Sequence, residues 1–301
     1  MLRRSAPWAA RSATTLGLAA ALSACASGEP GAPTTAGPGP ISDGVPFTIT
    51  KPGGPGPFPA VVIMHDCSGL GPRSSGAPGR WAKELVARGY LVMLPDSFTP
   101  RGVPDGVCIN PPPRGTDVGP DRRARDGFAA LAQLRRRPDV DGKRVGIMGG
   151  SHGGSSTLAT MGANTDEGFA AGIALYPRCA AFTGVFGVYR SRAPLLILIG
   201  DADDWTPAEP CRTLAERAAQ AGDPVALKIY PGAHHSFDSP NPVRYVATRI
   251  NPSAPSGRGA TTGGNPAAWA DSIQQVAAFF ERHLAVVRSR AQEIPQETPD
   301  I

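Results

Sequence analysis

Residues 149–153 read GGSHG and place Ser151 in the pattern G-x-S-x-G. A serine hydroxyl is a weak nucleophile that needs a histidine base, and the base needs a carboxylate to orient it. Both kinds of residue occur later in the chain, as acids within 201–204 and as the pair His234 and His235. Glycines alone would indicate only a tight turn, but together these residue types favour nucleophilic attack on a carbonyl carbon.

The segments around this serine alternate between buried strands and helices. Near-continuous apolar runs are typical of strands covered on both faces, and the segments between them have helical periodicity. The predicted strands span 57–66, 90–98, 143–151, 168–177, 193–203 and 224–235, and the predicted helices span 79–89, 121–140, 152–163, 208–222 and 265–284. The fold class is therefore α/β, with a mostly parallel sheet and helices on both faces in one domain.

Polar residues follow the predicted strands at their carboxyl ends, which is where parallel sheets bind ligands. They are His65 and Asp66, Asp96 and Ser97, Ser151, the acids of 201–204, and His234 and His235. Ser151 lies between a strand and a helix. That context is typical of a nucleophile elbow, in which the serine backbone is strained and the glycines avoid collisions with neighbouring elements.

Four segments resemble the dienelactone hydrolase family of α/β-hydrolases. They are 64–70 (MHDCSGL), 94–98 (LPDSF), 200–207 (GDADDWTP) and 230–237 (YPGAHHSF), and the resemblance extends from about residue 58 to residue 284. It implies the α/β-hydrolase fold, with catalytic residues in the chain order serine, acid, histidine. Carried over by position, the nucleophile is Ser151, the acid is Asp203 and the base is His235.

Neighbouring residues are rivals for the acid and base roles. We expect Asp201 to cap the end of a strand and Asp204 to be solvated or hydrogen-bonded locally. His234 is chemically able to act as the base, but His235 stands in the H-x-F pattern of the family. His283 is expected on the surface of the last helix.

The resemblance also implies an oxyanion hole of two backbone N–H groups, those of Cys67 and His152. The family's namesake enzymes use a cysteine nucleophile and a glutamate that interacts with it. This chain has Ser151 instead, and at the glutamate's position it has Asp66, a candidate for the substrate pocket. Hydrolysis of dienelactones themselves is therefore not expected.

Further pocket candidates are aromatic or basic. Phe98 and Trp205 follow strands and could line an acyl pocket, or they could be packing residues. Arg101 or Arg114 could attract an anionic substrate, although solvated arginines are the commoner case. Segment 238–265 follows the histidine and either flanks the site as a flexible loop or is a surface loop without function.

Four cysteines in the main part of the chain permit two disulfides with three connectivities. The preferred pairs are Cys67–Cys108, which would fix the oxyanion loop, and Cys179–Cys211, which would join the ends of two neighbouring strands. A free Cys67 beside the site is the alternative. None of the cysteines has the spacing of a metal site, so we expect no metal, and the proposed chemistry requires no cofactor.

The N-terminal residues 1–24 have the basic start and short apolar run of an export signal. The sequence LSAC at 22–25 resembles a lipobox, so Cys25 is expected to be lipidated as the first mature residue; an ordinary secretory signal is the alternative. Residues 25–44 are then a disordered linker, 45–286 the hydrolase domain and 287–301 a C-terminal tail.

These assignments predict where the protein is located and what it binds. We expect it in the bacterial cell envelope, lipid-anchored at the periplasmic face of a membrane, or soluble in the periplasm or secreted. Removing the signal lowers the formal charge from +5 to +2, so nucleic-acid binding is not expected. The expected partner is a small-molecule or polymeric ester, bound by a monomer.

The leading hypothesis is a serine hydrolase that cleaves carboxylic esters or lactones through an acyl-enzyme intermediate. A serine peptidase of the same fold is the first alternative, and the lack of a propeller or large cap domain counts against it. A surface-binding lipoprotein that has lost its catalytic activity is the second. The intact serine, acid and histidine in the correct order favour the enzyme.

Overall fold

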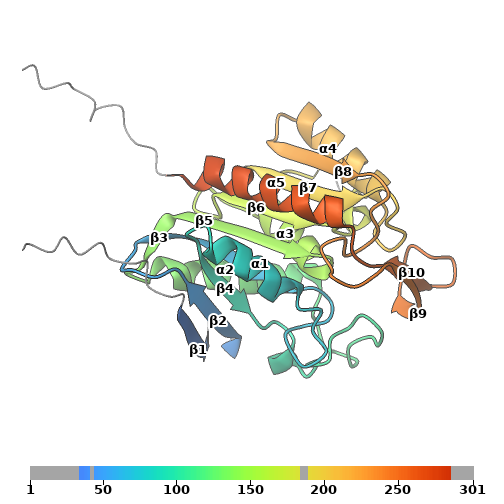
Figure 1. Cartoon of the computed structure of the whole chain (residues 1–301), viewed down its shortest axis with the longest axis horizontal. Coiled ribbons are helices and arrows are strands. Elements are labelled where there is room, and N and C mark those ends of the chain that lie inside the picture. The colour runs from blue at the N-terminus through green and yellow to red at the C-terminus, as the bar shows by residue number, and fades with distance from the viewer. Residues whose placement is uncertain (1–33, 41–43, 184–188, 286–301) are drawn as a thin grey trace, which may run out of the picture. The chain divides into compact units, whose positions relative to one another are not determined.

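The computed structural model describes residues 34–40, 44–183 and 189–285 (Figure 1). Its main sheet has the strand order β1-β2-β4-β3-β5-β6-β7-β8, in which neighbours from β4 to β8 are parallel and β1 and β2 are antiparallel. The strands are β1 (Thr34–Pro40), β2 (Pro46–Lys51), β3 (Phe58–Met64), β4 (Leu91–Pro95), β5 (Val140–Gly150), β6 (Ala171–Leu175), β7 (Leu195–Gly200) and β8 (Val225–Tyr230). The predicted α/β class with a mostly parallel sheet is confirmed.

Five α-helices accompany the sheet: α1 (Ala77–Val86), α2 (Pro120–Arg135), α3 (His152–Gly162), α4 (Ala208–Gln220) and α5 (Pro266–Leu284). Two neighbours on β5 show that both faces are covered. Gly146 faces Phe280 of α5, whereas Ile147 contacts Gly127 of α2. Because successive side chains of a strand point to opposite faces, α5 and α2 lie on opposite sides of the sheet (Figure 1).

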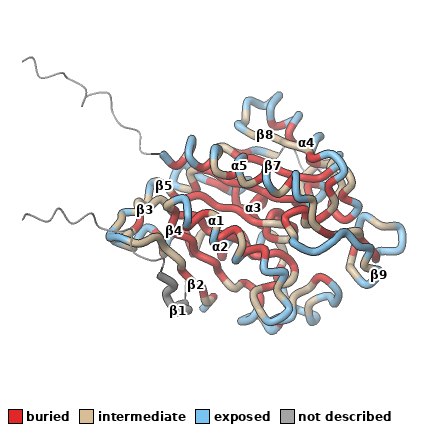
Figure 2. Tube along the Cα trace, in the orientation of Figure 1, coloured by how far each residue is buried: buried red, intermediate tan, exposed pale blue. Residues whose placement is uncertain are grey.

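The central strands form the core of the molecule. All residues of β4, β6 and β7 are buried, and Figure 2 shows buried residues concentrated along the middle of the sheet. On the α5 side, Trp81 of α1 packs edge-on against Trp269 of α5, with ring centroids 4.7 Å apart. Strands covered on both faces explain why the sequence has continuous apolar runs rather than alternation.

Strand β1 corrects the prediction that residues 25–44 form a disordered linker. Its residues 34–40 pair antiparallel with β2. Without β1, strand β2 would be the sheet edge with unpaired backbone N–H and C=O groups. Pairing through the backbone requires no apolar pattern, and prolines such as Pro38 are tolerated in edge strands. A search for apolar runs therefore missed this strand.

The terminal predictions lie outside the described residues. These are the signal peptide at 1–24, the lipidation site Cys25 and the tail at 287–301. Among the residues that are described, no helix combines the length and the apolar character needed to cross a membrane.

Segment 238–265, to which the sequence assigned no structure, contains a separate two-stranded antiparallel sheet of β9 (Arg244–Ile250) and β10 (Arg258–Thr262) (Figure 1). Backbone hydrogen bonds attach it at two points. The Ile250 N–H donates to the Cys108 carbonyl at 2.9 Å, and the Gly263 N–H donates to the His235 carbonyl at 3.0 Å. The hairpin is thus tied to two loops that carry predicted site residues.

Candidate active site

Ser151 stands at the sharp turn between β5 and α3. Its backbone has φ 55° and ψ −117°, a strained conformation for a residue other than glycine. A Cβ atom on Gly149 would lie 2.6 Å from the Met64 carbonyl oxygen, and one on Gly153 would overlap the same oxygen. The glycines therefore let β3, the turn and α3 approach closely, and the strain predicted for an elbow is present.

The other predicted triad residues lie in the loops after β7 and β8. The imidazole of His235 has Nε2 2.9 Å from the Ser151 Oγ and Nδ1 2.8 Å from the Asp203 Oδ2. Exposure is low for all three residues, at 8%, 1% and 3% for Ser151, His235 and Asp203. The three side chains form one continuous, shielded chain of hydrogen bonds.

Further groups fix the acid and the imidazole. The carboxylate of Asp203 accepts hydrogen bonds from the backbone N–H groups of Trp205 and Thr206 and from the Thr206 hydroxyl, at 2.8 to 3.0 Å. The His235 ring lies between the rings of Trp205 and Tyr176, with centroid distances of 4.6 and 4.8 Å. The sequence reasoning missed both Thr206, which lies in the loop after the predicted strand 193–203, and Tyr176, which lies at the end of the predicted strand 168–177.

The rival residues have other contacts. Asp201 accepts a backbone hydrogen bond at the turn after β8, consistent with the predicted cap. Asp204 accepts two hydrogen bonds from Thr261 of β10, both at 2.7 Å, so its partner belongs to the β9–β10 hairpin rather than to its own loop. His234 has a buried Nδ1 atom without a partner, and His283 packs on an aromatic ring within α5.

The oxyanion side of the site is built from backbone groups. Cys67 lies in the loop after β3, and His152 is the first residue of α3, where helix N–H groups lack intrahelical acceptors. Among the described residues, neither the Cys67 N–H nor the His152 N–H has a hydrogen-bond acceptor. Both residues line the same cavity as Ser151, which agrees with the oxyanion hole expected from their N–H groups.

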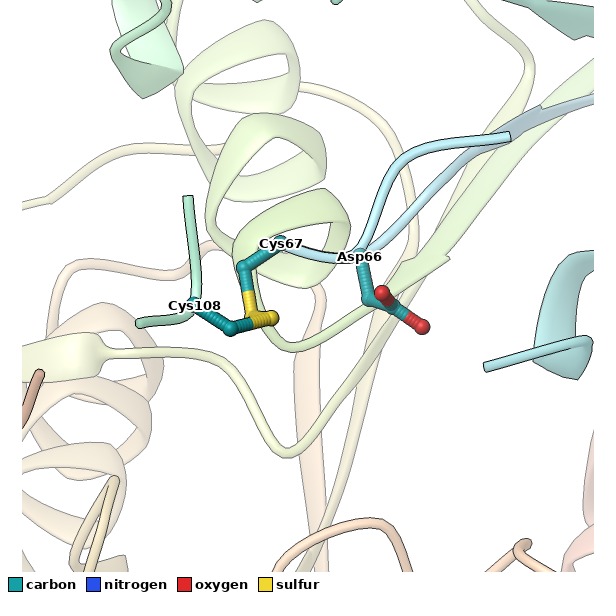
Figure 3. Close-up of side chains that lie close together, drawn as sticks. All are labelled: Asp66, Cys67 and Cys108. Atoms are coloured by element: carbon teal, nitrogen blue, oxygen red, sulfur yellow. A yellow bond between two sulfur atoms is a disulfide. The ribbon is translucent and has the colours of Figure 1, made fainter. Parts of the chain in front are cut away.

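Both predicted disulfides, Cys67–Cys108 and Cys179–Cys211, are present. Figure 3 shows the first, with the Asp66 side chain directed away from it. The Asp66 carboxylate and the two sulfur atoms lie within 4.8 Å of one another, an arrangement that could suggest a metal site. Sulfurs joined in a disulfide are not thiolate ligands, so this group offers a metal only one carboxylate.

A cavity of about 260 Å³ opens beside Ser151. Its wall is mainly apolar, and it includes the first disulfide together with Val107, Trp205, Ile250 and Pro252. Trp205, a predicted pocket residue, is part of this wall. Ile250 and Pro252 come from the β9–β10 segment, so of the two alternatives for 238–265 the structure agrees with the one that flanks the site.

The other two pocket candidates, Asp66 and Phe98, do not line this cavity. The short Asp66 side chain is held by the backbone N–H and hydroxyl of Ser68 and by the Ser75 hydroxyl. Phe98 is fully buried and packs edge-on against the rings of His65 and His152. Both residues thus contact the loop after β3, which carries Cys67, and do not face the cavity.

The arginines predicted to attract an anionic substrate are also outside the cavity. Arg101 is held by Asp126 through two hydrogen bonds of 2.7 Å, and Arg114 is exposed elsewhere on its loop. Arg178 does line the cavity, and its side chain is exposed. It directly follows the predicted strand 168–177, so the rule of strand carboxyl ends could have identified it.

His152 lies beside Ser151 but is electrostatically unlike His235. Burial and the nearby Arg123 guanidinium lower the pKa of His152 to about 3. Its Nδ1 atom lies 2.7 Å from the Arg123 Nη1, which can only donate, so Nδ1 is the acceptor. His152 is therefore neutral at physiological pH and is not suited to accept the serine proton.

Residues 45–284 match the family model described as "Dienelactone hydrolase family". The chain belongs to the dienelactone hydrolase family. This membership indicates a hydrolase that acts on esters, and it agrees with the resemblance carried by segments 64–70, 94–98, 200–207 and 230–237.

A relative from Bradyrhizobium sp, "Probable 2-oxo-3-(5-oxofuran-2-ylidene)propanoate lactonase", is 26% identical over 208 residues, which are 63% of this chain and 77% of that protein. The "Putative Dienelactone Hydrolase" of Klebsiella pneumoniae has a similar structure, with a TM-score of 0.64 at 20% identity, covering 84% of this chain and all of that one. The esterase Est2 of Thermogutta terrifontis gives a TM-score of 0.56 at 16% identity, covering 83% and 94%. The two structural similarities establish a shared α/β-hydrolase fold.

Proposed function

We propose that this protein is a serine hydrolase of carboxylic esters and lactones, acting through an acyl-enzyme on Ser151. The observation that carries the proposal is the buried hydrogen-bond chain from Asp203 through His235 to Ser151, at a strained turn that faces a cavity. A hydroxyl, an imidazole and a carboxylate in this order are the parts needed to activate a serine.

In the acylation step, the Ser151 Oγ attacks the acyl carbon while its proton passes to the His235 Nε2. The Asp203 carboxylate keeps the Nδ1 proton in place and stabilises the imidazolium that forms. The negative charge on the carbonyl oxygen is then stabilised by the N–H groups of Cys67 and His152, and one such donor contributes about 3–4 kcal/mol.

The intermediate collapses when the C–O bond to the leaving group breaks and His235 donates its proton to the departing alkoxide. For a lactone, this alkoxide stays attached to the acyl chain. His235 then removes a proton from water, which attacks the acyl-enzyme, and the proton returns to Ser151 as the acid is released. Every step uses residues of this chain, and the same imidazole serves as base and acid.

The size of the cavity favours small acyl groups. About 260 Å³ lined mainly by apolar side chains accommodates a short acyl chain or a small lactone ring. The names of the relatives, a lactonase and an esterase, agree with this substrate class. A short acyl substituent on a polymer could enter the cavity in the same way.

The activity is tested with a series of p-nitrophenyl esters and one small lactone. The wild-type chain should hydrolyse the acetate and butyrate esters, with kcat/KM at least about tenfold lower for the decanoate because its chain exceeds the cavity. The Ser151→Ala variant should retain only background hydrolysis. Failure of the wild-type chain to hydrolyse any of these esters would contradict the proposal and would favour an inactive binding protein.

We also propose that the chain is exported and lipid-anchored through Cys25. Two disulfides support an oxidising compartment such as the periplasm. Expressed in a bacterium with its full N-terminus, the wild-type chain should sediment with membranes, whereas the Cys25→Ala variant should be released or retained unprocessed. Equal partition of the two into the soluble periplasmic fraction would support the secretory alternative.

A further inference from the structure

Arg123 of α2 is among the largest fully buried side chains of the described chain, with 0% exposure. Placing a guanidinium group inside a protein is unfavourable by several kcal/mol unless its N–H groups find acceptors. A neighbouring cation, Arg101, already forms two 2.7 Å hydrogen bonds to Asp126. Neutralising Asp126 therefore does not by itself account for a second buried arginine.

The contacts of Arg123 lead to the oxyanion side of the site. Its Nη2 donates to the His65 carbonyl at 2.8 Å, and its Nη1 donates to the His152 Nδ1 at 2.7 Å. The guanidinium carbon also lies 5.0 Å from the centre of the Phe98 ring, a cation–π distance. One side chain thus joins the loop after β3 to the first residue of α3.

These two attachment points border the two N–H donors assigned to the oxyanion. The His65 carbonyl belongs to the loop that carries Cys67 two residues later, and His152 supplies the other N–H itself. Because the donors are on different elements, β3 and α3 must keep a fixed spacing for both to reach one oxygen. Arg123 connects the two elements, because it hydrogen-bonds to His65 after β3 and to His152 of α3.

The charge of this cluster is also fixed. Burial lowers the pKa of Arg123 to about 9, opposed by the nearby Asp126 and Asp66, so the guanidinium is protonated at neutral pH. Burial and Arg123 hold the pKa of His65 well below its usual range, as they do for His152. At neutral pH the imidazoles of His65 and His152 are therefore neutral, and the Arg123 guanidinium beside them is positively charged.

We propose that Arg123 is a positioning residue for the oxyanion hole, holding the Cys67 and His152 N–H groups at the spacing required by the tetrahedral intermediate. The inference rests on the proposed function of Ser151 and adds a residue that the family motifs above do not include. Because the oxygen carries its full charge only after attack, losing Arg123 should impair the tetrahedral state more than substrate binding.

The test compares Arg123→Met with Arg135→Met, a matched control on the same helix. Arg135 also donates to backbone carbonyls, those of Gly142, Glu167 and Gly168, but none of these residues lines the active-site cavity. For p-nitrophenyl acetate, Arg123→Met should lower kcat by about 10- to 100-fold with KM changed less than about threefold, since removing one oxyanion donor outright lowers kcat by about 10²–10³. Arg135→Met should keep the wild-type kcat.

A second readout is the inhibition constant of butylboronic acid, which forms a tetrahedral adduct with an active serine. It should weaken in Arg123→Met by about the same factor as kcat, because both depend on the oxyanion hole. A folded Arg123→Met variant with wild-type kcat and boronate affinity would overturn the inference while leaving the proposed function intact. A wild-type chain without esterase activity would instead overturn the proposed function itself.

Arg123→Lys keeps the positive charge but cannot donate from a rigid fork to both acceptors. It should show a smaller loss of kcat and of boronate affinity than Arg123→Met, again with KM nearly constant. If the methionine variant does not fold, the lysine variant decides the question. Wild-type values of both quantities in folded Arg123→Lys would contradict a positioning role.

Discussion

Each side of the site has one histidine close to Ser151 in space or in sequence, the buried His235 and the half-buried His152, and the charged groups that contact the two rings are opposite in sign. His235 is backed by the Asp203 carboxylate at 2.8 Å, whereas His152 is backed by the Arg123 guanidinium at 2.7 Å. A carboxylate stabilises an imidazolium ion, and a guanidinium opposes its formation. The two imidazoles thus differ both in the charged group beside them and in their contact with the serine, because only the His235 ring is hydrogen-bonded to the Ser151 Oγ among the described residues.

The two sides also differ in what they are made of. The acid–base side consists of side chains from the loops after β7 and β8, which are adjacent strands. The proposed oxyanion side consists of backbone N–H groups on two elements, which are joined to the rest of the fold by the Cys67–Cys108 disulfide and by the hydrogen bonds of Arg123 of α2. Substitutions on the acid–base side should therefore abolish activity. Substitutions on the oxyanion side should lower kcat only in part, because they shift the backbone N–H donors without removing them.

The largest expected effect separates two adjacent histidines on the acid–base side. His235→Gln should lower kcat by about 10⁴-fold or more, because the serine loses its base. The kcat of His234→Gln should remain within about threefold of the wild-type kcat, since His234 forms no hydrogen bond with Ser151 or Asp203 among the described residues. Steady-state hydrolysis of p-nitrophenyl acetate checks both, and similar losses in the two variants would refute the assignment of His235.

The disulfides give a second comparison, with similar effects on stability and different effects on activity. They join residues 41 and 32 positions apart, so replacing either pair with alanines should lower the free energy of unfolding by about 4 kcal/mol. Loss of Cys67–Cys108 should also lower kcat by about tenfold or more, because it frees an oxyanion donor. Urea unfolding and kcat, measured where each variant is folded, test this contrast; equal kcat values would contradict it.

A smaller effect should appear in the pH dependence of stability. In His65 the Nδ1–H donates to the Asp66 carbonyl and Nε2 accepts the Ser97 N–H, so the ring is neutral, and burial and Arg123 lower its pKa. Below pH 6.5 the unfolded chain takes up a proton that the folded chain does not. Stability is thus present above about pH 6.5 and is lost as the pH falls, by about 2 kcal/mol at pH 5.

Urea unfolding at pH 7.5 and pH 5 measures this loss in the wild-type chain and in His65→Asn. The comparison is needed because the buried Asp238, whose pKa is raised by desolvation, contributes the opposite slope. The loss of stability between the two pH values should be smaller in His65→Asn. The same loss in both proteins would show that His65 is not the group responsible.

The smallest expected effect concerns the mouth of the cavity, where Arg178 contributes an exposed positive charge. Arg178→Ala should raise KM for an ester bearing a carboxylate by about three- to tenfold, and leave KM for an uncharged ester of equal size nearly unchanged. The effect should shrink at high salt. An equal change for both esters would indicate a packing role instead.

The acid–base side could be predicted from the sequence almost completely. Ser151, Asp203 and His235 each follow an apolar strand, and the chain itself fixes which loops meet at the edge of a parallel sheet. The fold class follows from the same alternation. Both rest on patterns that are local in sequence.

The oxyanion side could be predicted only in part. The two disulfides were anticipated as pairs, but the burial of Arg123 in an arginine-rich helix has no local signal, because the segment 121–140 holds several arginines. The same limit applies to Phe98, whose ring partner His152 is distant in sequence. Asp66 is different, because its partners Ser68 and Ser75 are near in sequence and only the folded loop shows that its carboxylate is directed to them. Strand β1 and the β9–β10 hairpin lack apolar alternation and were missed for that reason.

The most direct test of the central claim is the reaction of the folded chain with a fluorophosphonate, followed by peptide mass spectrometry. We expect one adduct per chain, on Ser151, formed rapidly in the wild-type protein and in His234→Gln and at least about 10³-fold more slowly in His235→Gln. No adduct on folded wild-type protein, or one of equal rate in both histidine variants, would contradict a nucleophile activated through Asp203 and His235.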